Sequence, residues 1–157
     1  MTAYLKSLDA NRSFFTQGEV ERFEREARQL DDDLKRGKVE LGFEVFRLYR
    51  QRVEERTAFA LAVLDQGFNF DQDETYRFDR AKAAWAATPA ELDHIWRQRV
   101  KNDWLGLKLA KKKDEEIRKV LRERYEGLAK RVRQFDSDDV YQTFINAYIE
   151  TLEPHTS

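Results

Sequence analysis

The sequence lacks cysteine altogether, which excludes disulfide bonds, thiolate nucleophiles and thiolate zinc sites. It has only 2 prolines and 6 glycines among 157 residues, and so few backbone breakers favour helices over a turn-rich β fold. No run of about 18 apolar residues occurs, so the sequence predicts no transmembrane segment. Its first residues have neither the apolar core nor the small-residue cleavage site of a signal peptide.

An excess of charge of one sign is missing as well, because 38% of the residues are charged yet the formal net charge is −1. This balance argues against disorder by self-repulsion and against a general affinity for nucleic acid. The 11 Phe, 6 Tyr and 3 Trp provide enough apolar volume for one core. We therefore expect one all-α domain over residues 1–157, an irregular bundle of about five to six helices with a long aromatic-rich connection.

Residues 16–34 carry the clearest pattern of an amphipathic helix. Thr16 and Glu19 have the spacing of a capping box, in which each side chain bonds a free backbone amide. Gly37 is expected to end the helix in a left-handed conformation. The apolar stripe, with spacings of three and four, is Val20, Phe23, Ala27, Leu30 and Leu34.

A second, longer helix is predicted over residues 38–64, with a deeply buried end from residue 59 onward. Its apolar positions are Phe43, Phe46, Tyr49, Val53, Ala60 and Val63. Residues 65–67 break the pattern at Gly67. Residues 68–84 mix Phe, Tyr and acids without a sustained period, so we expect an irregular connection packed down by its aromatic side chains.

Three more helices are predicted in the second half of the chain. A Thr-Pro-x-Glu sequence at residues 88–91 begins the first, acids at residues 114–116 begin the second, and residues 136–137 begin the third. Pro154 must end the last helix. The three stripes are Leu92, Trp96, Val100, Trp104 and Leu107; Ile117, Leu121, Tyr125, Leu128, Val132 and Phe135; and Tyr141, Phe144, Tyr148 and Leu152.

The chain offers no catalytic, cofactor or metal site that the sequence can identify. Hydrolysis needs a nucleophile with a base, but only two histidines are present, His94 and His155, and no serine stands in a nucleophile motif. The serines are Ser7, Ser13, Ser137 and Ser157. His94 lies one helical turn before Gln98 among charged residues, and we interpret it as an ordinary surface or half-buried histidine.

A calcium loop is suggested by the alternating acids Asp71 and Asp73 with Glu74, since hard cations favour clustered carboxylates. The pattern then fails, because Tyr76 stands where the turn requires glycine and Lys82 where a bidentate glutamate belongs. We interpret these acids as a solvated loop.

Residues 97–133 are strongly basic, with 14 Lys and Arg against 6 Asp and Glu. Trp96, Trp104 and Tyr125 are interleaved with these charges, an arrangement that could engage nucleic acid. The same aromatic residues fall on the apolar stripes, however, and are needed for a core. We therefore favour a basic face that answers the acidic remainder of the chain or an acidic partner.

Several short stretches of the sequence match motifs of a known protein family. They are Tyr4, Leu5, Leu8, Asp9 and residues 11–15; Leu61, Leu64, Asp65, Phe68, Phe70, Glu74 and Thr75; Trp96, Arg97, Arg99, Val100, Lys101, Asp103, Leu107, Lys108 and Leu109; residues 114–118, Leu121, Arg124 and Tyr125; and Ser137, Asp139, Val140 and residues 153–157. In this order, over nearly the whole chain, they resemble the N-terminal region of the tail-specific (C-terminal-processing) serine proteases of Gram-negative bacteria. One departure is the basic triplet at residues 111–113, where a glycine-containing turn is expected.

The resemblance implies a helical N-terminal domain of a larger protease, with no catalytic residue of its own. In that family the element at residues 153–157 lies just before a PDZ domain, and a protease domain with a serine nucleophile and a lysine base comes next. Both are expected after residue 157. Together with a C-terminal helical region, the domain would surround these parts in a periplasmic enzyme that degrades or trims proteins from their C-termini. Protein substrates and a helical-repeat lipoprotein adaptor are the implied partners, and the parent's signal peptide would lie outside this chain.

Two other function classes remain open: a free-standing helical interaction module, and a nucleic-acid-binding protein. The sequence encoded directly after residue 157 would distinguish the interaction module from a protease domain. A salt-dependent gel shift of DNA or RNA would support the nucleic-acid-binding protein. Met1 stands directly before what reads as the last turns of a helix, so we expect the chain to be part of a longer protein. We also expect some members of one aromatic set, Phe14, Phe15 and the aromatic residues from 68 to 85, to be exposed, where later domains would cover them.

Overall fold

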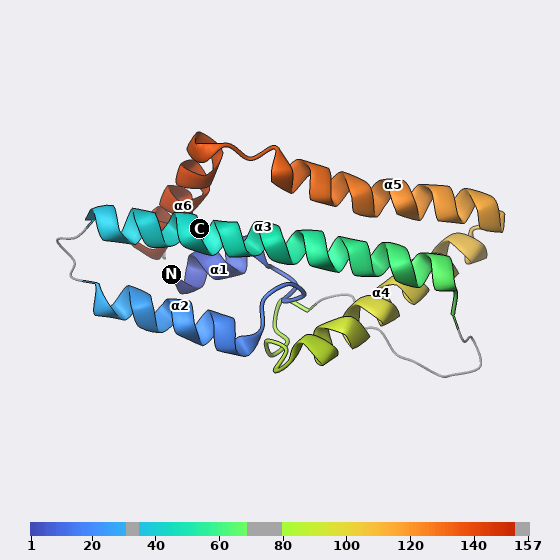
Figure 1. Ribbon diagram of the computed structural model, residues 1–157, viewed down its shortest axis with the longest axis horizontal. Coiled ribbons are helices and arrows are strands. Elements are labelled where there is room, and N and C mark those ends of the chain that lie inside the picture. Colours follow the sequence, from blue (N-terminus) through green and yellow to red (C-terminus); the bar gives the residue numbers. More distant parts are fainter. Residues whose placement is uncertain (31–34, 69–79, 153–157) are drawn as a thin grey trace.

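The computed structural model describes residues 1–30, 35–68 and 80–152, with the side chains of residues 150–152 left aside. In this part of the chain the predicted all-α class is confirmed, with six helices (Figure 1). They are α1 (Thr2–Leu8), α2 (Gln17–Gln29), α3 (Lys35–Gln66), α4 (Pro89–Leu109), α5 (Asp114–Arg133) and α6 (Ser137–Leu152).

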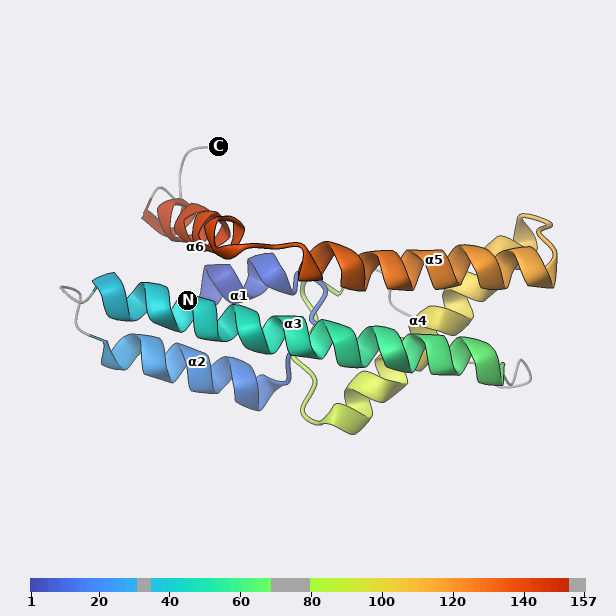
Figure 2. The same cartoon turned by 45° about the horizontal axis from the view of Figure 1, so that its top comes forward.

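The long helix α3 is the axis of the molecule. Figures 1 and 2 show α2 beside its N-terminal half and α5 beside its C-terminal half, while α4 crosses under that second half. Helix α6 turns away from α5 and packs on α1 and on the first half of α3. Every other helix except α1 thus makes a substantial contact with α3, because its 32 residues bury side chains on several faces.

The predicted helix starts at residues 16 and 88 are confirmed in detail, whereas the long helix begins at Lys35, three residues before the predicted residue 38. The Thr16 hydroxyl accepts the Glu19 amide, and a Glu19 carboxylate oxygen accepts the Thr16 amide at 2.9 Å, which is a complete capping box. The Thr88 hydroxyl accepts the Glu91 amide at 3.2 Å, with proline in the first turn. Each cap satisfies backbone groups that the helix itself leaves free.

One core runs through the described residues and contains most predicted apolar positions of α2, α3, α4 and α5. Phe135 was wrongly predicted on the α5 stripe, since it is exposed and lies beyond the end of that helix at Arg133. The fully buried side chains of greatest volume are Trp96, Tyr4, Tyr125, Phe15, Phe23, Leu5, Leu64, Leu92, Ile117 and Leu121. The ring of Trp96 meets those of Phe14 and Tyr125 at centroid distances of 5.5 and 6.4 Å. This packing joins the N-terminal loop to α4 and α5.

The predicted end of the first amphipathic helix was wrong. Helix α2 ends at Gln29, where Leu30 takes an extended backbone (φ −78°, ψ 133°), and Gly37 lies within α3 instead of capping α2. Leu34 lies outside the described residues. At the far end of α3 the predicted break is confirmed, because Gly67 adopts a left-handed φ of 83°.

The predicted apolar stripe of α6 was partly wrong. Phe144 is buried as expected, but Tyr141 and Tyr148 are 46% and 43% exposed. The buried neighbours of Phe144 are Val140 and Ala147, which lie four residues before it and three after it. The helix is apolar on two faces, and the smaller side chains fit the close approach to α1 and α3.

Phe14 and Phe15 are not among the exposed members of the predicted aromatic set, since they are 7% and 0% exposed. Phe68 and Trp85 are half-buried, and residues 69–79 of the predicted connection lie outside the described residues. Among the side chains that the structure describes, the large apolar ones that are exposed are Leu105, Leu109, Phe135, Tyr141, Tyr148 and Ile149.

The basic turn between α4 and α5 adopts the geometry for which glycine was expected. Lys111 has a φ of 65°, in the left-handed region that favours glycine. Its amide donates to the Lys108 carbonyl at 3.0 Å, and the Lys112 amide donates to the Leu107 carbonyl at 3.2 Å. Lys111 therefore stands in a left-handed conformation that glycine adopts more readily.

Candidate functional site

The segment that carries the first family-like motif is a hydrogen-bonded clasp around Asp9. The Asp9 side chain is buried, and its two carboxylate oxygens accept the backbone amides of Ser13, Phe14 and Phe15 at 2.8, 2.9 and 2.9 Å. Burial raises the pKa of the Asp9 carboxyl, and the three amides and nearby Arg80 oppose that shift. The motif therefore holds two phenylalanines in the core.

The same loop is fastened to the segment that precedes α4. Arg12, with a φ of 53°, donates to the Ala83 carbonyl and lies over the Trp85 ring at 5.2 Å. The Gln17 amide donates to the Ala86 carbonyl at 2.8 Å, and Trp96 Nε1 donates to the Ser13 carbonyl at 2.7 Å. These polar groups are used to hold segments together.

The described residues that were weighed for catalysis lie on different elements of the structure. His94 is exposed on α4, as interpreted from the sequence, and Ser7 donates to the Tyr4 carbonyl within its own helix. Ser13 is buried in the clasp, and Ser137 is exposed at the start of α6. His155 and Ser157 lie outside the described residues.

The suggested calcium loop at residues 71–74 lies outside the described residues. Across residues 1–30, 35–68 and 80–152, no group of three or more His, Asp or Glu side chains is placed to hold a metal ion. In the same part of the chain, no helix has the length and apolar character needed to span a bilayer.

The basic stretch of α4 and α5 uses its aromatic residues in the core. Trp96, Trp104 and Tyr125 are 0%, 8% and 1% exposed, so their faces are not available for stacking on bases. Arg122 pairs with Asp65 at 2.7 Å, and Arg133 pairs with Glu54. Basic side chains of α5 thus answer acids of α3, as the favoured interpretation expected.

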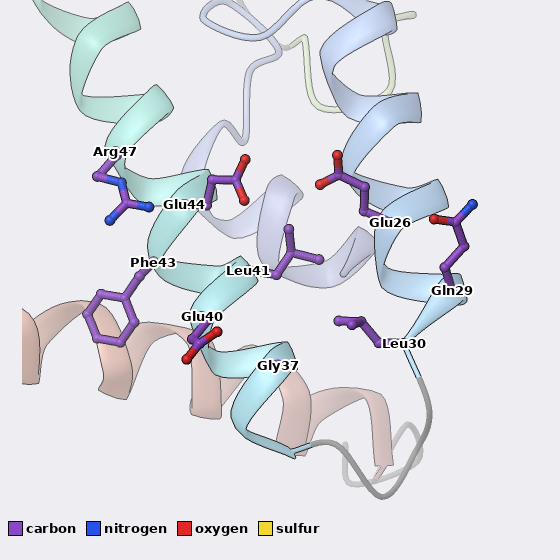
Figure 3. Close-up of a pocket in the computed structure, with 9 residues that line it drawn as sticks. All are labelled: Glu26, Gln29, Leu30, Gly37, Glu40, Leu41, Phe43, Glu44 and Arg47. Carbon is purple, nitrogen blue, oxygen red and sulfur yellow. The ribbon is translucent and has the colours of Figure 1, made fainter.

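An open groove of about 690 Å³ lies between α2 and α3, and we call it the α2–α3 groove. Figure 3 shows Glu26 on α2 and Glu44 on α3 pointing into the gap, with Leu30 and Leu41 deeper along it. Arg22 Nε lies 3.6 Å from Glu26 Oε1, and Arg22 Nη2 lies 3.1 Å from Glu44 Oε1. One guanidinium therefore partly neutralises both carboxylates. This groove can hold an apolar side chain, but its acids already have a partner.

A second groove, of about 320 Å³, lies between α3 and the start of α6, and we call it the α3–α6 groove. Phe43 and Arg47, which Figure 3 shows on α3, line this groove as well as the α2–α3 groove. The lining residues of the α3–α6 groove are Phe43, Phe46, Arg47, Arg50, Phe135, Asp136, Ser137 and Val140. Sequence reasoning assigned Phe43 and Phe46 to the core and missed the arginines, although Arg47 and Arg50 follow them on the same helix.

Polar groups around the α3–α6 groove are oriented by the helix start. The Asp136 carboxylate accepts the Asp139 amide at 2.9 Å, and Asp139 accepts the Asp136 amide at 3.1 Å. Arg50 donates to the Phe135 carbonyl at 2.8 Å, and its guanidinium lies 5.4 Å from the centroid of the Phe46 ring. Asp136 is thus engaged with the α6 N-terminus, while Arg47 and Arg50 form no ion pair with any described residue.

Similarity to known proteins extends over the whole chain. A family model described as the tail specific protease N-terminal domain matches residues 1–157. The tail-specific protease of Haemophilus influenzae is 34% identical over 155 residues, which make up 98% of this chain and 22% of that protein. The chain therefore spans about a fifth of the length of that relative.

Proposed function

The chain belongs to the tail-specific protease N-terminal domain family, and on this basis we propose that it is a non-catalytic scaffold and substrate-access domain of a larger protease. The parent would be a C-terminal-processing serine endopeptidase that degrades or trims periplasmic proteins. Its PDZ, protease and C-terminal helical regions would follow residue 157, and the serine and lysine that perform the chemistry would lie among them.

The observation that carries the scaffold role is the use of buried polar groups along the chain. Asp9, Arg12 and Trp96 all hold backbone segments to one another, and the Tyr4 hydroxyl donates to the Gly42 carbonyl at 2.9 Å. Buried polar groups with fixed partners make a rigid unit. A rigid α3 with two open grooves can present a surface to other domains or to a polypeptide in transit.

The partners of this domain are, in this proposal, the later regions of its own chain, the protein substrates and a helical-repeat lipoprotein adaptor. The alternative is a free-standing helical interaction module, and the exposed Tyr141, Tyr148 and Ile149 of α6 would serve either role. Nucleic acid is not among the proposed partners, because the aromatic residues of the basic stretch are buried.

Association in trans tests the proposal. Residues 1–157 and the remainder of the parent protease would be purified separately, mixed, and followed by sedimentation velocity. We expect a stable complex that contains one copy of each part, with no self-association of either part. Two species that sediment independently at high concentration would favour the free-standing module.

A further inference from the structure

We propose that the α3–α6 groove is a binding site for a segment of protein substrate in which an acidic side chain stands next to an apolar one. This inference rests on the proposed substrate-access role. The acidic side chain would pair with Arg47 and Arg50, and its apolar neighbour would pack on the phenylalanines of the groove.

The charge of the groove supports an anionic partner. Arg47 is exposed and forms no hydrogen bond or ion pair with the described residues, and it stands one turn before Arg50 on α3. The Nε atom of Arg50 is buried without a hydrogen-bond partner in the same part of the chain. A buried N–H donor without an acceptor is costly, and a ligand carboxylate beside it would supply that acceptor.

The walls of the groove support the apolar half of the ligand. The rings of Phe46 and Phe135 are stacked at a centroid distance of 5.4 Å with an angle of 17° between them, and Phe135 is 36% exposed. Phe43 is half-buried beside Arg47. A space of about 320 Å³ has room for one or two side chains rather than for a packed domain.

The neighbouring α2–α3 groove differs in charge, and this difference predicts selectivity. Arg47 also lines that groove, but there it stands with three carboxylates, Glu26, Glu40 and Glu44, so that groove would oppose an acidic segment. An acidic and apolar segment should therefore prefer the α3–α6 groove, where Arg47 and Arg50 stand with the single carboxylate of Asp136.

The test is a fluorescence anisotropy titration of residues 1–157 with a short fluorescein-labelled peptide of alternating glutamate and leucine. A matched peptide of alternating lysine and leucine is the control ligand. We expect the glutamate peptide to bind more tightly, and Arg47→Gln to weaken it about tenfold, since a hydrogen bond to a charged group contributes roughly that factor. Arg25→Gln, an exposed arginine on α2, should leave binding unchanged.

A variant that gains affinity for the control peptide distinguishes a lost binding site from a misfolded domain. Arg47→Glu should reverse the preference in favour of the lysine peptide, which a misfolded domain would not do. Equal binding of the glutamate peptide by the parent sequence and by Arg47→Gln would overturn the proposal, as would an equal loss in Arg25→Gln. Because the assay needs no protease activity, its failure would leave the proposed protease role standing, and failure of that role would leave the groove measurement intact.

Discussion

Gly42 on α3 lies directly against the ring of Phe144 on α6. A Cβ atom built on Gly42 would stand 2.8 Å from Cδ2 and 3.1 Å from Cγ of that ring, closer than side chains pack. The Gly42 carbonyl also accepts the Tyr4 hydroxyl, and the Tyr4 and Phe144 rings meet edge to face at 5.2 Å. Helices α1, α3 and α6 therefore meet at a position where only glycine fits without a shift.

Gly42→Ala should lower the free energy of unfolding by about 1 kcal/mol. Overpacking in a core costs about 1–3 kcal/mol, and the better helix propensity of alanine offsets roughly 1 kcal/mol of this. Gly106→Ala is the matched control, because a Cβ there would meet nothing within 4 Å, so this variant should be stabilised. Urea titrations of both variants decide the matter, and a gain of stability in both would contradict the packing at Phe144.

Asp9→Ala should destabilise the domain by about 3 kcal/mol or more, because three buried amides would lose a charged acceptor. Asn11→Ala changes an exposed side chain of the same loop and should stay within about 0.5 kcal/mol of the parent. Thermal and urea unfolding measure both. If the two variants melt alike, the clasp does not hold Phe14 and Phe15 in place.

Alkaline pH should destabilise the fold through its buried tyrosines. Burial raises the pKa of Tyr49 to about 12, with the negative charge of Asp9 adding to the effect, and burial also raises the pKa values of Tyr4 and Tyr125. An unfolded tyrosine loses its proton near pH 10, so between about pH 10 and 12 the folded state holds protons that the unfolded state has lost. The stabilisation is complete below pH 10 and is lost as the pH rises through this window.

Urea unfolding at about pH 9 and about pH 11 measures this loss. Tyr49→Phe removes one of the titrating groups, so its stability should fall less steeply between the two values. A free energy of unfolding that does not change over this range, or a Tyr49→Phe variant with an unchanged slope, would show that the Tyr49 hydroxyl is not buried.

Residues 1–157 should not cleave peptides with apolar C-termini. The sequence provides no paired nucleophile and base, and the described serines and His94 lie on separate elements. A chromatographic assay of such a peptide, incubated with the purified chain, should recover it intact. Turnover that disappears in a Ser137→Ala variant would refute the assignment of no active site.

The sequence predicted most helix starts because caps act locally. A hydroxyl and a carboxylate three residues apart satisfy free amides wherever the helix lies, so Thr16 and Thr88 could be recognised without tertiary information. Helix α2 ended eight residues before the predicted stop at Gly37, because glycine can also occupy a helix interior and no local rule made it a cap there.

Burial on α6 and in the N-terminal loop could not be predicted in the same way. Val140 and Ala147 are buried because α6 meets α1 and α3 closely, which leaves the larger Tyr141 and Tyr148 outside. Phe14 and Phe15 are buried because Asp9 turns the loop inward, a contact between side chain and backbone that periodicity does not reveal. Arg47 and Arg50 became candidate ligand-binding residues only when α6 was seen to form the other wall of their groove.

The most direct test of the scaffold and substrate-access role is the rate at which the parent protease degrades a whole protein, compared with the rate for the parent lacking residues 1–157. A short peptide substrate that needs no guidance to the active site serves as the reference in both enzymes. The scaffold account predicts that deletion slows degradation of the protein much more than cleavage of the peptide, and that adding residues 1–157 in trans restores part of the loss. Equal rates for the two enzymes on the whole protein would contradict it.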